Sequence, residues 1–360
     1  MQTAQRTETR ERTRTQTPLL QVEDLHIHFK TATGLARVVD GANLTVYRDE
    51  IFGIAGESGC GKTTLVEAIL HIIRFSNRVA TGRVLFTPEA GGETVDLMAL
   101  SPARMRHFRW EHLSYIPQGS MNSLNPVMRI GAQIADGMTA HGVDVGTARD
   151  KVPELLEKVG LEDSVGRLYP HELSGGMKQR AIIATAIAMD PELIIADEPT
   201  TALDVNVQRV ILDTLLRLRR ELGVAILLVS HDLPVHAQLV DRIGIMYAGQ
   251  VVEIGDVRPV LKNPLHPYTQ GLMESIPMIG GERTRLGGIA GVAPSPVEWP
   301  TGCRFHPRCP HAMEICTNLI PALGAIAPGP RVVAGAEREI EPARFTACHL
   351  YLESTTRSDA

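Results

Sequence analysis

The octet GESGCGKT, residues 56–63, restricts the fold of this chain more than any other stretch. The apolar run EIFGIAG leads into it and predicts a short buried strand, and KTTLVEAILHII predicts the helix that follows. Glycines at positions 56, 59 and 61 let backbone N–H groups curl around phosphate oxygens. We expect Lys62 to reach the β- and γ-phosphates of a nucleotide and Thr63 to bind Mg²⁺. Cys60 is interpreted as a small residue of the loop rather than a redox group.

Alternating strand and helix patterns continue along the chain. LLQVEDLHIHF and ARVVDGANLTVY alternate apolar and polar residues, which predicts an antiparallel β portion near the N-terminus. Two amphipathic helices are expected within residues 128–160, and a helix is expected over SGGMKQRAIIATAIAM. The series predicts an α/β core with a mainly parallel sheet.

The segment LIIADEPTTALD predicts a second functional element. Four apolar residues form a buried strand, and two acids emerge at its carboxyl end, where open α/β sheets place ligands. Asp197 is suited to hold Mg²⁺, and Glu198 to orient or deprotonate an attacking water. An ordinary acidic turn is the alternative, and the phosphate loop in the same chain argues against it.

The segment ELSGGMKQR predicts a second phosphate-binding surface. Ser174 can cap a helix, and Gly175 and Gly176 expose backbone donors at the N-terminus of that helix. One nucleotide hardly needs two such loops from one subunit. We therefore expect the second loop to reach a nucleotide that a partner chain holds.

The order of these motifs resembles that of the ATP-binding cassette (ABC) ATPases. The resemblance covers roughly Leu19 to Gly255 and includes Gln118, ALD at 202–204 and His231. It implies a head-to-tail dimer with two ATP molecules, each between the Lys62 loop of one subunit and the Ser174 loop of the other. It further implies that Gln118 contacts Mg²⁺ and links to membrane subunits, that His231 contacts the γ-phosphate, and that Asp204 lies at the dimer seam. Phe29 is the best match for the residue that stacks on adenine, with Val38 or a neighbour of Val38 as the alternative.

The resemblance gives three sets of site residues. The catalytic set is Glu198, His231, Lys62 and Gln118. The nucleotide-binding set is Phe29, Gly56, Glu57, Ser58, Gly59, Cys60, Gly61, Lys62, Thr63, Thr64, Ser174, Gly175, Gly176 and Asp204. The Mg²⁺ set is Thr63, Gln118 and Asp197.

Two further stretches narrow the subclass. GSMNSLNPVMRIGAQI after Gln118 and NPLHPYTQGLMESIP at 263–277 resemble segments of the oligopeptide/dipeptide importer ATPases. The resemblance implies peptide import. A metal chelate, an oligosaccharide or a glutathione-like compound stays open as the cargo, because such an ATPase does not touch the cargo. A soluble cassette acting on nucleic acid or ribosomes is the more distant alternative.

Four of the five cysteines lie near the end of the chain, with the spacing C-x5-C-x6-C-x31-C. Four thiolates suit tetrahedral zinc or an iron–sulfur cluster, and the paired C-x2-C spacing of a common zinc ribbon is absent from the sequence. Peptide-importer ATPases often end in such an extension. The resemblance therefore favours a [4Fe–4S] cluster on Cys303, Cys309, Cys316 and Cys348 over zinc.

The expected organisation has three parts. Residues 1–18 read as a disordered tail, and residues 19–262 as an ABC nucleotide-binding domain with a helical subdomain at about 119–172. Residues 263–360 form a small, irregular, cysteine-containing extension. With one cassette, no apolar run of membrane-spanning length and no secretory signal, the chain is expected in the cytoplasm, on the inner face of the membrane.

The implied partners follow from this organisation. They are two membrane permeases, an extracytoplasmic binding protein, and either a sister ABC ATPase or a second copy of the chain. A net charge of -5 gives no global basic field, so nucleic acid is not expected as a partner.

Overall fold

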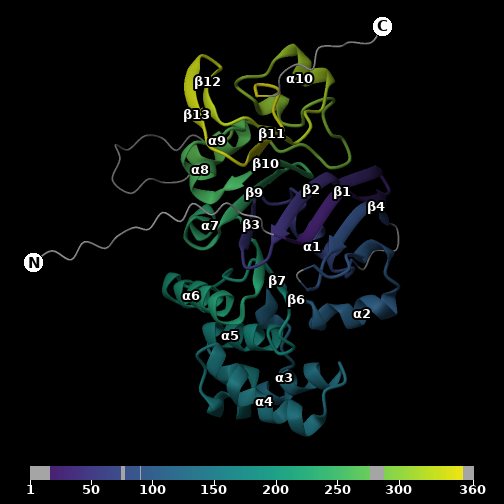
Figure 1. Ribbon diagram of the computed structural model, residues 1–360, viewed down its shortest axis with the longest axis vertical. Helices are drawn as coiled ribbons and strands as arrows, with labels where there is room; N and C mark the ends of the chain where they lie inside the picture. The colour runs from purple at the N-terminus through teal and green to yellow at the C-terminus, as the bar shows by residue number, and fades with distance from the viewer. Residues whose placement is uncertain (1–16, 74–77, 90, 276–287, 352–360) are drawn as a thin grey trace, which may run out of the picture.

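The computed structural model describes residues 17–73, 78–89, 91–275 and 288–351 (Figure 1). The tail expected over residues 1–18 therefore lies almost wholly outside the described residues. An eight-stranded sheet forms the core, in the order β11-β14-β10-β9-β3-β8-β7-β6. Its strands are β3 (Ile51–Ala55), β6 (Leu113–Ile116), β7 (Leu193–Asp197), β8 (Ala225–Val229), β9 (Arg242–Tyr247), β10 (Gln250–Asp256), β11 (Gly324–Ile326) and β14 (Arg344–Thr346).

The parallel part of this sheet positions the motifs. Strands β6, β7, β8, β3 and β9 pair in parallel, and every residue of β3, β7 and β8 is buried. Parallel strands covered on both faces need continuous apolar runs, which is why these segments lack alternation. Their carboxyl ends meet at one edge of the sheet. Gly56, Glu198 and Ser230 follow there directly after the strands, so the phosphate loop and the acidic pair lie at the same edge of the sheet, with the end of β8 between them.

A second, antiparallel sheet forms the N-terminal side, as the sequence predicts. Its order is β2-β1-β4-β5. The strands are β1 (Pro18–Thr31), β2 (Gly34–Tyr47), β4 (Arg78–Phe86) and β5 (Val95–Asp96). Helix α1 (Lys62–Ile69) packs its buried residues Leu65 and Ile69 into the core that this sheet shares with β3 and β8. The sequence patterns did not reveal β4 or α2 (Pro102–Glu111).

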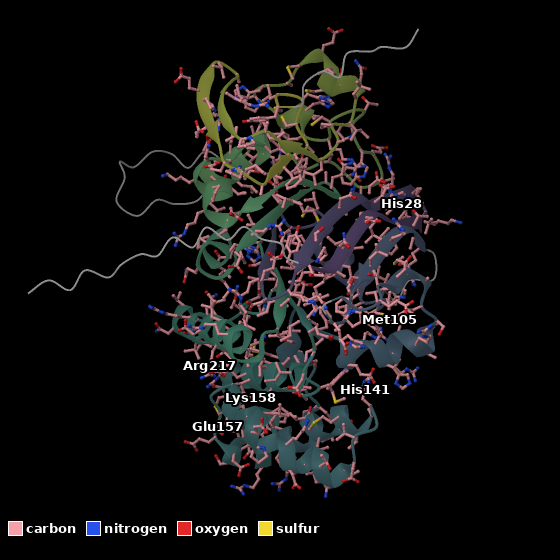
Figure 2. All side chains as sticks on the ribbon, in the orientation of Figure 1. His28, Met105, His141, Glu157, Lys158 and Arg217 are labelled. Atoms are coloured by element: carbon pink, nitrogen blue, oxygen red, sulfur yellow. The ribbon has the colours of Figure 1, made fainter. Side chains whose placement is uncertain are left out.

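The helical part lies at the opposite end of the molecule from the C-terminal extension (Figure 1). It contains α3 (Ile130–Thr139) and α4 (Val145–Lys158), which confirms the two helices expected within 128–160. α5 (Gly175–Ala186) and α6 (Val205–Leu222) connect it to the sheet. Arg217 of α6 donates a 2.8 Å hydrogen bond to the carbonyl of Lys158, beside Glu157 at the end of α4 (Figure 2). This bond caps one of the carbonyls left open at the C-terminus of α4.

The C-terminal extension is less irregular than expected. β11 and β14 continue the main sheet beyond β10, and β12 (Gly329–Val333) pairs with β13 (Ala336–Ile340). The remaining helices are α7 (Leu233–Leu239), α8 (Val257–Lys262), α9 (Pro267–Glu274) and α10 (Glu314–Asn318). Short 3-10 turns occur at η1 (Leu97–Ala99), η2 (Ser120–Asn122), η3 (Asp163–Arg167), η4 (Pro170–Glu172) and η5 (His306–Arg308). Every helix in the described ranges is too short or too polar to span a bilayer.

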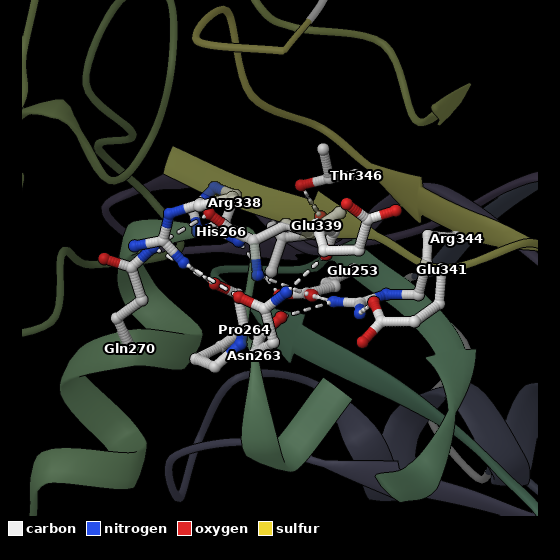
Figure 3. A network of polar contacts seen from close by, with 12 residues as sticks. Glu253, Asn263, Pro264, His266, Gln270, Arg338, Glu339, Glu341, Arg344 and Thr346 are labelled. Atoms are coloured by element: carbon white, nitrogen blue, oxygen red, sulfur yellow. Dashed lines mark hydrogen bonds and ion pairs between the residues drawn. The ribbon is translucent and has the colours of Figure 1, made fainter. Parts of the chain in front are cut away.

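A buried ion pair anchors the extension to the sheet (Figure 3). Arg344 on β14 and Glu253 on β10 are both fully buried, 2.5 Å apart. Glu253 also accepts the backbone N–H groups of Leu265 and His266 at 2.9 and 3.0 Å. A charge out of water is stable only when it is paired and hydrogen-bonded, and this carboxylate has both kinds of partner.

Candidate nucleotide site and cysteine site

The phosphate loop is tightly packed against its surroundings. A Cβ atom at Gly56 would lie 2.1 Å from the carbonyl oxygen of Met246, and one at Gly61 would lie 2.5 Å from that of Val38. Gly61 also has a φ of 108°, a conformation that favours glycine. Lys62 is buried, and its Nζ donates to the carbonyls of Gly56 and Glu57 at 2.8 and 3.0 Å. The lysine ammonium therefore lies inside the curl of the loop, where a phosphate group would bind.

Cys60 lies in the same loop and is buried. Burial raises the pKa of its thiol, although Lys62 acts in the opposite direction. A thiol with a raised pKa is a poor nucleophile. This supports the interpretation of Cys60 as a packing residue.

Asp197 ends β7 and is completely buried. Neither carboxylate oxygen has a hydrogen-bond partner at close distance among the described residues. Desolvation raises the pKa of Asp197 to about 6, against the opposing influence of the Thr63 hydroxyl and Lys62. A buried carboxylate without donors is costly. Oxygen ligands of this kind suit Mg²⁺, so the residues present fit the ion: Asp197 and Thr63 would hold it, and it would supply charge neutralisation at the phosphates.

Glu198 and His231 are brought together. Oε1 of Glu198 accepts from the His231 backbone N–H at 3.0 Å and lies 2.7 Å from His231 Nδ1. Oε2 accepts the Thr201 hydroxyl at 2.9 Å. The φ of Glu198 is 50°, in the left-handed region that few non-glycine residues adopt. Strained backbone of this kind often marks functional positions. The arrangement fixes the direction of a carboxylate that can accept a proton from water.

The remaining predicted residues lie around this centre. Ser174 and Asp204 are exposed and cap α5 and α6: Ser174 accepts from the Met177 N–H, and Asp204 from those of Asn206 and Val207. Gly176 packs on α6, because a Cβ there would lie 2.5 Å from a Val207 methyl. Ser58, Gly59 and Gln118 are exposed, and Thr64 is partly buried at the start of α1.

The two candidates for adenine stacking differ in position. Val38 on β2 contacts the loop at Gly61 through its carbonyl. Phe29 on β1 is partly buried against the core of the antiparallel sheet. The role of Phe29 stays a prediction.

Sequence reasoning missed two side chains at the phosphate loop. The Tyr268 hydroxyl accepts the Glu57 N–H at 2.8 Å, and Arg308 pairs with the Glu57 carboxylate at 3.0 Å. Tyr268 belongs to the HPYTQGL stretch and Arg308 directly precedes Cys309, so both stood in segments already singled out. Tyr268 and Arg308 lie 211 and 251 positions from Glu57 in the sequence. No local sequence pattern therefore indicates that they contact the loop.

The four C-terminal cysteines gather in one region. The backbone N–H of Cys303 donates to the carbonyl of Cys316 at 2.8 Å. Burial raises the pKa of Cys348 to about 12, and the charges of Cys303, Cys309 and Cys316 add to this effect. Four thiols in mutual electrostatic range are an appropriate donor set for a metal group that would hold them as thiolates.

Among the described residues, one group of three or more potential metal ligands has donor atoms that all lie within 4.8 Å of one another, and it is His26, His28 and Asp40.

A phosphate loop and an acidic strand end at one edge of a parallel sheet define a P-loop ATPase. Residues 39–201 match the family described as ABC transporter, and residues 252–316 match the C-terminal region of oligopeptide/dipeptide transporters. The dipeptide transport ATP-binding protein DppD of Escherichia coli (strain K12) is 40% identical over 314 residues, which are 86% of this chain and 94% of that protein. DppD of Bacillus subtilis (strain 168) is 39% identical over 307 residues, 84% of this chain and 90% of that protein. The chain therefore belongs to the ABC transporter family of ATP-binding proteins and is an ATPase.

Solved structures share the fold. A dimeric, post-hydrolysis structure of the ATP-binding cassette MJ0796 bound to ADP and Pi has a TM-score of 0.58 at 24% identity, which shows the fold alone. It covers 67% of this chain and 99% of the other. The cbiO1 protein from Clostridium perfringens, part of the ABC transporter complex cbiONQ, has a TM-score of 0.56 at 25% identity and covers 68% of this chain and 91% of the other. These findings confirm the fold class expected from the motifs.

Proposed function

We propose that this chain is the ATPase subunit of an ABC importer for dipeptides or oligopeptides. The observation that carries this proposal is the extent of the likeness: the relatives named for dipeptide transport align through both the cassette and the C-terminal region. The cargo enters through the partner subunits, and this chain supplies the free energy of ATP hydrolysis.

In the proposed mechanism, two cassettes close on ATP. The Lys62 loop of one subunit holds the phosphates, and Ser174 with Gly175 of the other contributes donors from the N-terminus of α5. Glu198 positions the attacking water and takes its proton, and His231 holds the carboxylate in place. Lys62 offsets charge on the transferred phosphoryl group. The exposure of Ser174 and Asp204 supports their use at a subunit interface, between two copies or with a sister ATPase.

A groove next to Gln118 supports docking of a permease. It has a volume of about 640 Å³ and lies between α2, α3 and the segment after β6. Apolar and aromatic side chains line it, among them Trp110, Pro117, Leu124 and Met128. His141, which follows the C-terminus of α3 (Figure 2), stacks on Trp110 with ring centroids 5.4 Å apart. A groove of this composition suits a short amphipathic helix of a membrane subunit. Through such contacts the chain would sit on the cytoplasmic face of the membrane.

For the cysteine site we propose a [4Fe–4S] cluster held by Cys303, Cys309, Cys316 and Cys348. The four-thiol donor set, which lacks the paired C-x2-C spacing of a common zinc ribbon, supports it over zinc. Iron and acid-labile sulfide should co-purify with the protein under anaerobic conditions. Stoichiometric zinc without sulfide would overturn the assignment.

The importer proposal is tested by gentle purification of the tagged protein from the membranes of its own host. Two permeases should co-purify, with a sister ATPase if the dimer is mixed, and an extracytoplasmic binding protein should accompany them and lead to the cargo. Met128→Arg, in the groove, should lose the permeases but keep ATP binding. Val145→Arg is the matched control, because Val145 is already exposed on α4 and does not line the groove. Ribosomal or nucleic-acid partners without a permease would overturn the proposal.

A further inference from the structure

Two side chains from beyond the cassette hold Glu57, the second residue of the phosphate loop. Arg308 forms a bidentate pair with it, with Nη1 3.0 Å from Oε2 and Nη2 3.1 Å from Oε1. The Tyr268 hydroxyl accepts the backbone N–H of Glu57 at 2.8 Å. The loop thus receives both a charged and a neutral contact from residues C-terminal to β10.

Arg308 is itself held rigidly. Its side chain is 6% exposed, and its Nε donates to the carbonyl of Ala290 at 2.9 Å. Beside it, Tyr247 packs on Tyr268 and on Phe305, with ring centroids 4.5 and 5.3 Å apart. Phe305 and Arg308 both lie between Cys303 and Cys309. A continuous set of packed side chains therefore runs from the cysteine segment to the phosphate loop.

Charge gives this contact a consequence for nucleotide binding. A carboxylate in the phosphate loop repels a triphosphate, and the repulsion is strong where the groups are partly shielded from water. The Glu57 side chain is 29% exposed, and the guanidinium of Arg308 neutralises it with planar, bidentate geometry. The same pair fixes the backbone that carries the Glu57 carbonyl, which accepts from Lys62.

We propose that Arg308 and Tyr268 are positioning residues of the ATP site, and that through them ATP affinity depends on the cysteine segment being correctly folded. The first part rests on the ATPase site alone. The second part rests in addition on the proposed cluster at the four cysteines, and the two parts have separate tests.

The first test measures equilibrium binding of a fluorescent ATP analogue. Arg308→Gln should weaken binding by about tenfold, because Glu57 keeps its charge and loses its partner. Glu57→Gln in otherwise unaltered protein should bind the analogue about threefold or more tightly, because Arg308 is left as a free cation near the phosphates. The double variant should recover most of the affinity that Arg308→Gln loses. A purely structural contact predicts that all three variants bind more weakly, and that result would overturn the proposal.

The control is Arg338→Gln. Arg338 is also a partly buried cation of the extension, but its hydrogen bonds go to Asn263 and to the carbonyl of Pro264. Its loss should leave ATP binding unaltered. Tyr268→Phe should raise the KM for ATP several-fold with a smaller effect on kcat, because the N–H of Glu57 loses its acceptor. Thermal unfolding of each variant separates a loss of affinity from a loss of folded protein.

The second test uses reciprocity: if the cysteine segment affects ATP affinity, ATP must stabilise the segment equally. In unaltered protein a non-hydrolysable ATP analogue should slow the release of iron to a chelator, and in Arg308→Gln it should not. If the purified protein carries no iron, the rate of thiol labelling of the four C-terminal cysteines is measured instead, with and without the analogue. Cys60→Ser is introduced for this measurement so that only these four thiols react. Equal rates with and without the analogue would disprove the coupling and leave the first test unaffected. Iron and sulfide content, measured separately, decides the cluster proposal.

Discussion

His231 Nδ1 lies 2.7 Å from Oε1 of Glu198, and the His231 backbone N–H donates to the same oxygen at 3.0 Å. One residue thus supplies two contacts to a carboxylate that stands at the end of β7. With the Thr201 hydroxyl on the other oxygen, both carboxylate oxygens have fixed hydrogen-bond donors. In the role of base that we propose for Glu198, such a carboxylate needs little rearrangement in the transition state.

This geometry predicts the behaviour of Glu198→Gln. The amide keeps the size of the side chain but cannot take a proton from water, so kcat for ATP hydrolysis should fall by about 10²- to 10⁴-fold. Binding of a fluorescent ATP analogue should persist, because the phosphate loop is intact. Steady-state hydrolysis and equilibrium binding check the two parts. Hydrolysis at the rate of the unaltered protein would show that Glu198 is not the base.

Packing between α5 and α6 predicts a contrast between two neighbouring glycines. Gly176→Ala places a methyl group 2.5 Å from Cγ1 of Val207, and overpacking of this kind costs about 1–3 kcal/mol of unfolding free energy. Gly175→Ala meets its nearest side chain, Leu203, at 3.3 Å and should cost less. Val207→Ala should restore much of the stability of Gly176→Ala. Urea unfolding checks all three, and equal losses for the two glycines would contradict the packing argument.

The buried ion pair between Arg344 and Glu253 predicts a large loss of unfolding free energy on substitution, although it lies outside the nucleotide site. Glu253→Ala removes the fully buried partner of Arg344 and leaves it only the partly exposed Glu341 as a carboxylate partner, which should destabilise the protein by about 3–5 kcal/mol. The control is Glu23→Ala: the Glu23 and Arg83 side chains are 38% and 63% exposed, and such pairs contribute about 0–1 kcal/mol. Thermal or urea unfolding measures both. A loss at Glu253 as small as that at Glu23 would show that the pair does not anchor the extension.

Asp40 predicts a pH-dependent contribution to stability. Burial raises the pKa of Asp40, but hydrogen bonds from His26, His28 and Arg304 outweigh burial and lower it below its usual value. A carboxyl group with a lowered pKa stabilises the folded state above its unfolded pKa of about 3.9 and loses this contribution as the pH falls through its folded pKa. Asp40→Asn should therefore lower the melting temperature by about 2–4 °C at pH 5 and above. The difference from unaltered protein should shrink below about pH 4.

The matched control for this prediction is Asp24→Asn. The Asp24 side chain is 78% exposed, and its Oδ1 lies 3.0 Å from Nε2 of His26, the ring nitrogen that does not contact Asp40. Its replacement should alter the melting temperature little at any pH. A difference at Asp40 that already disappears between pH 7 and pH 6 would mean that another group carries the effect.

The local chemistry of the nucleotide site could be read from the sequence. The phosphate loop is eight consecutive residues whose glycines, lysine and threonine act within a few ångströms of one another. Its function can therefore be predicted from the sequence without knowledge of the tertiary structure. The position of the acidic pair at 197–198 could also be predicted from the sequence, because an apolar strand that ends in two acids indicates the ligand-binding edge of a parallel sheet. The extension was harder to read, because short strands such as β11 and β14 are too brief for a periodic pattern to show.

The sequence by itself therefore determined the fold class, the phosphate loop, the acidic pair at the end of its strand and the grouping of four cysteines. Only the tertiary structure decided that β14 pairs with β10, that His231 holds Glu198, and that Arg308 reaches Glu57 across 251 positions. The physical reason is the range of each interaction along the chain. Capping, turn and loop geometry act between near neighbours, whereas pairing between remote segments depends on how the whole chain packs, which no local pattern of residue types records.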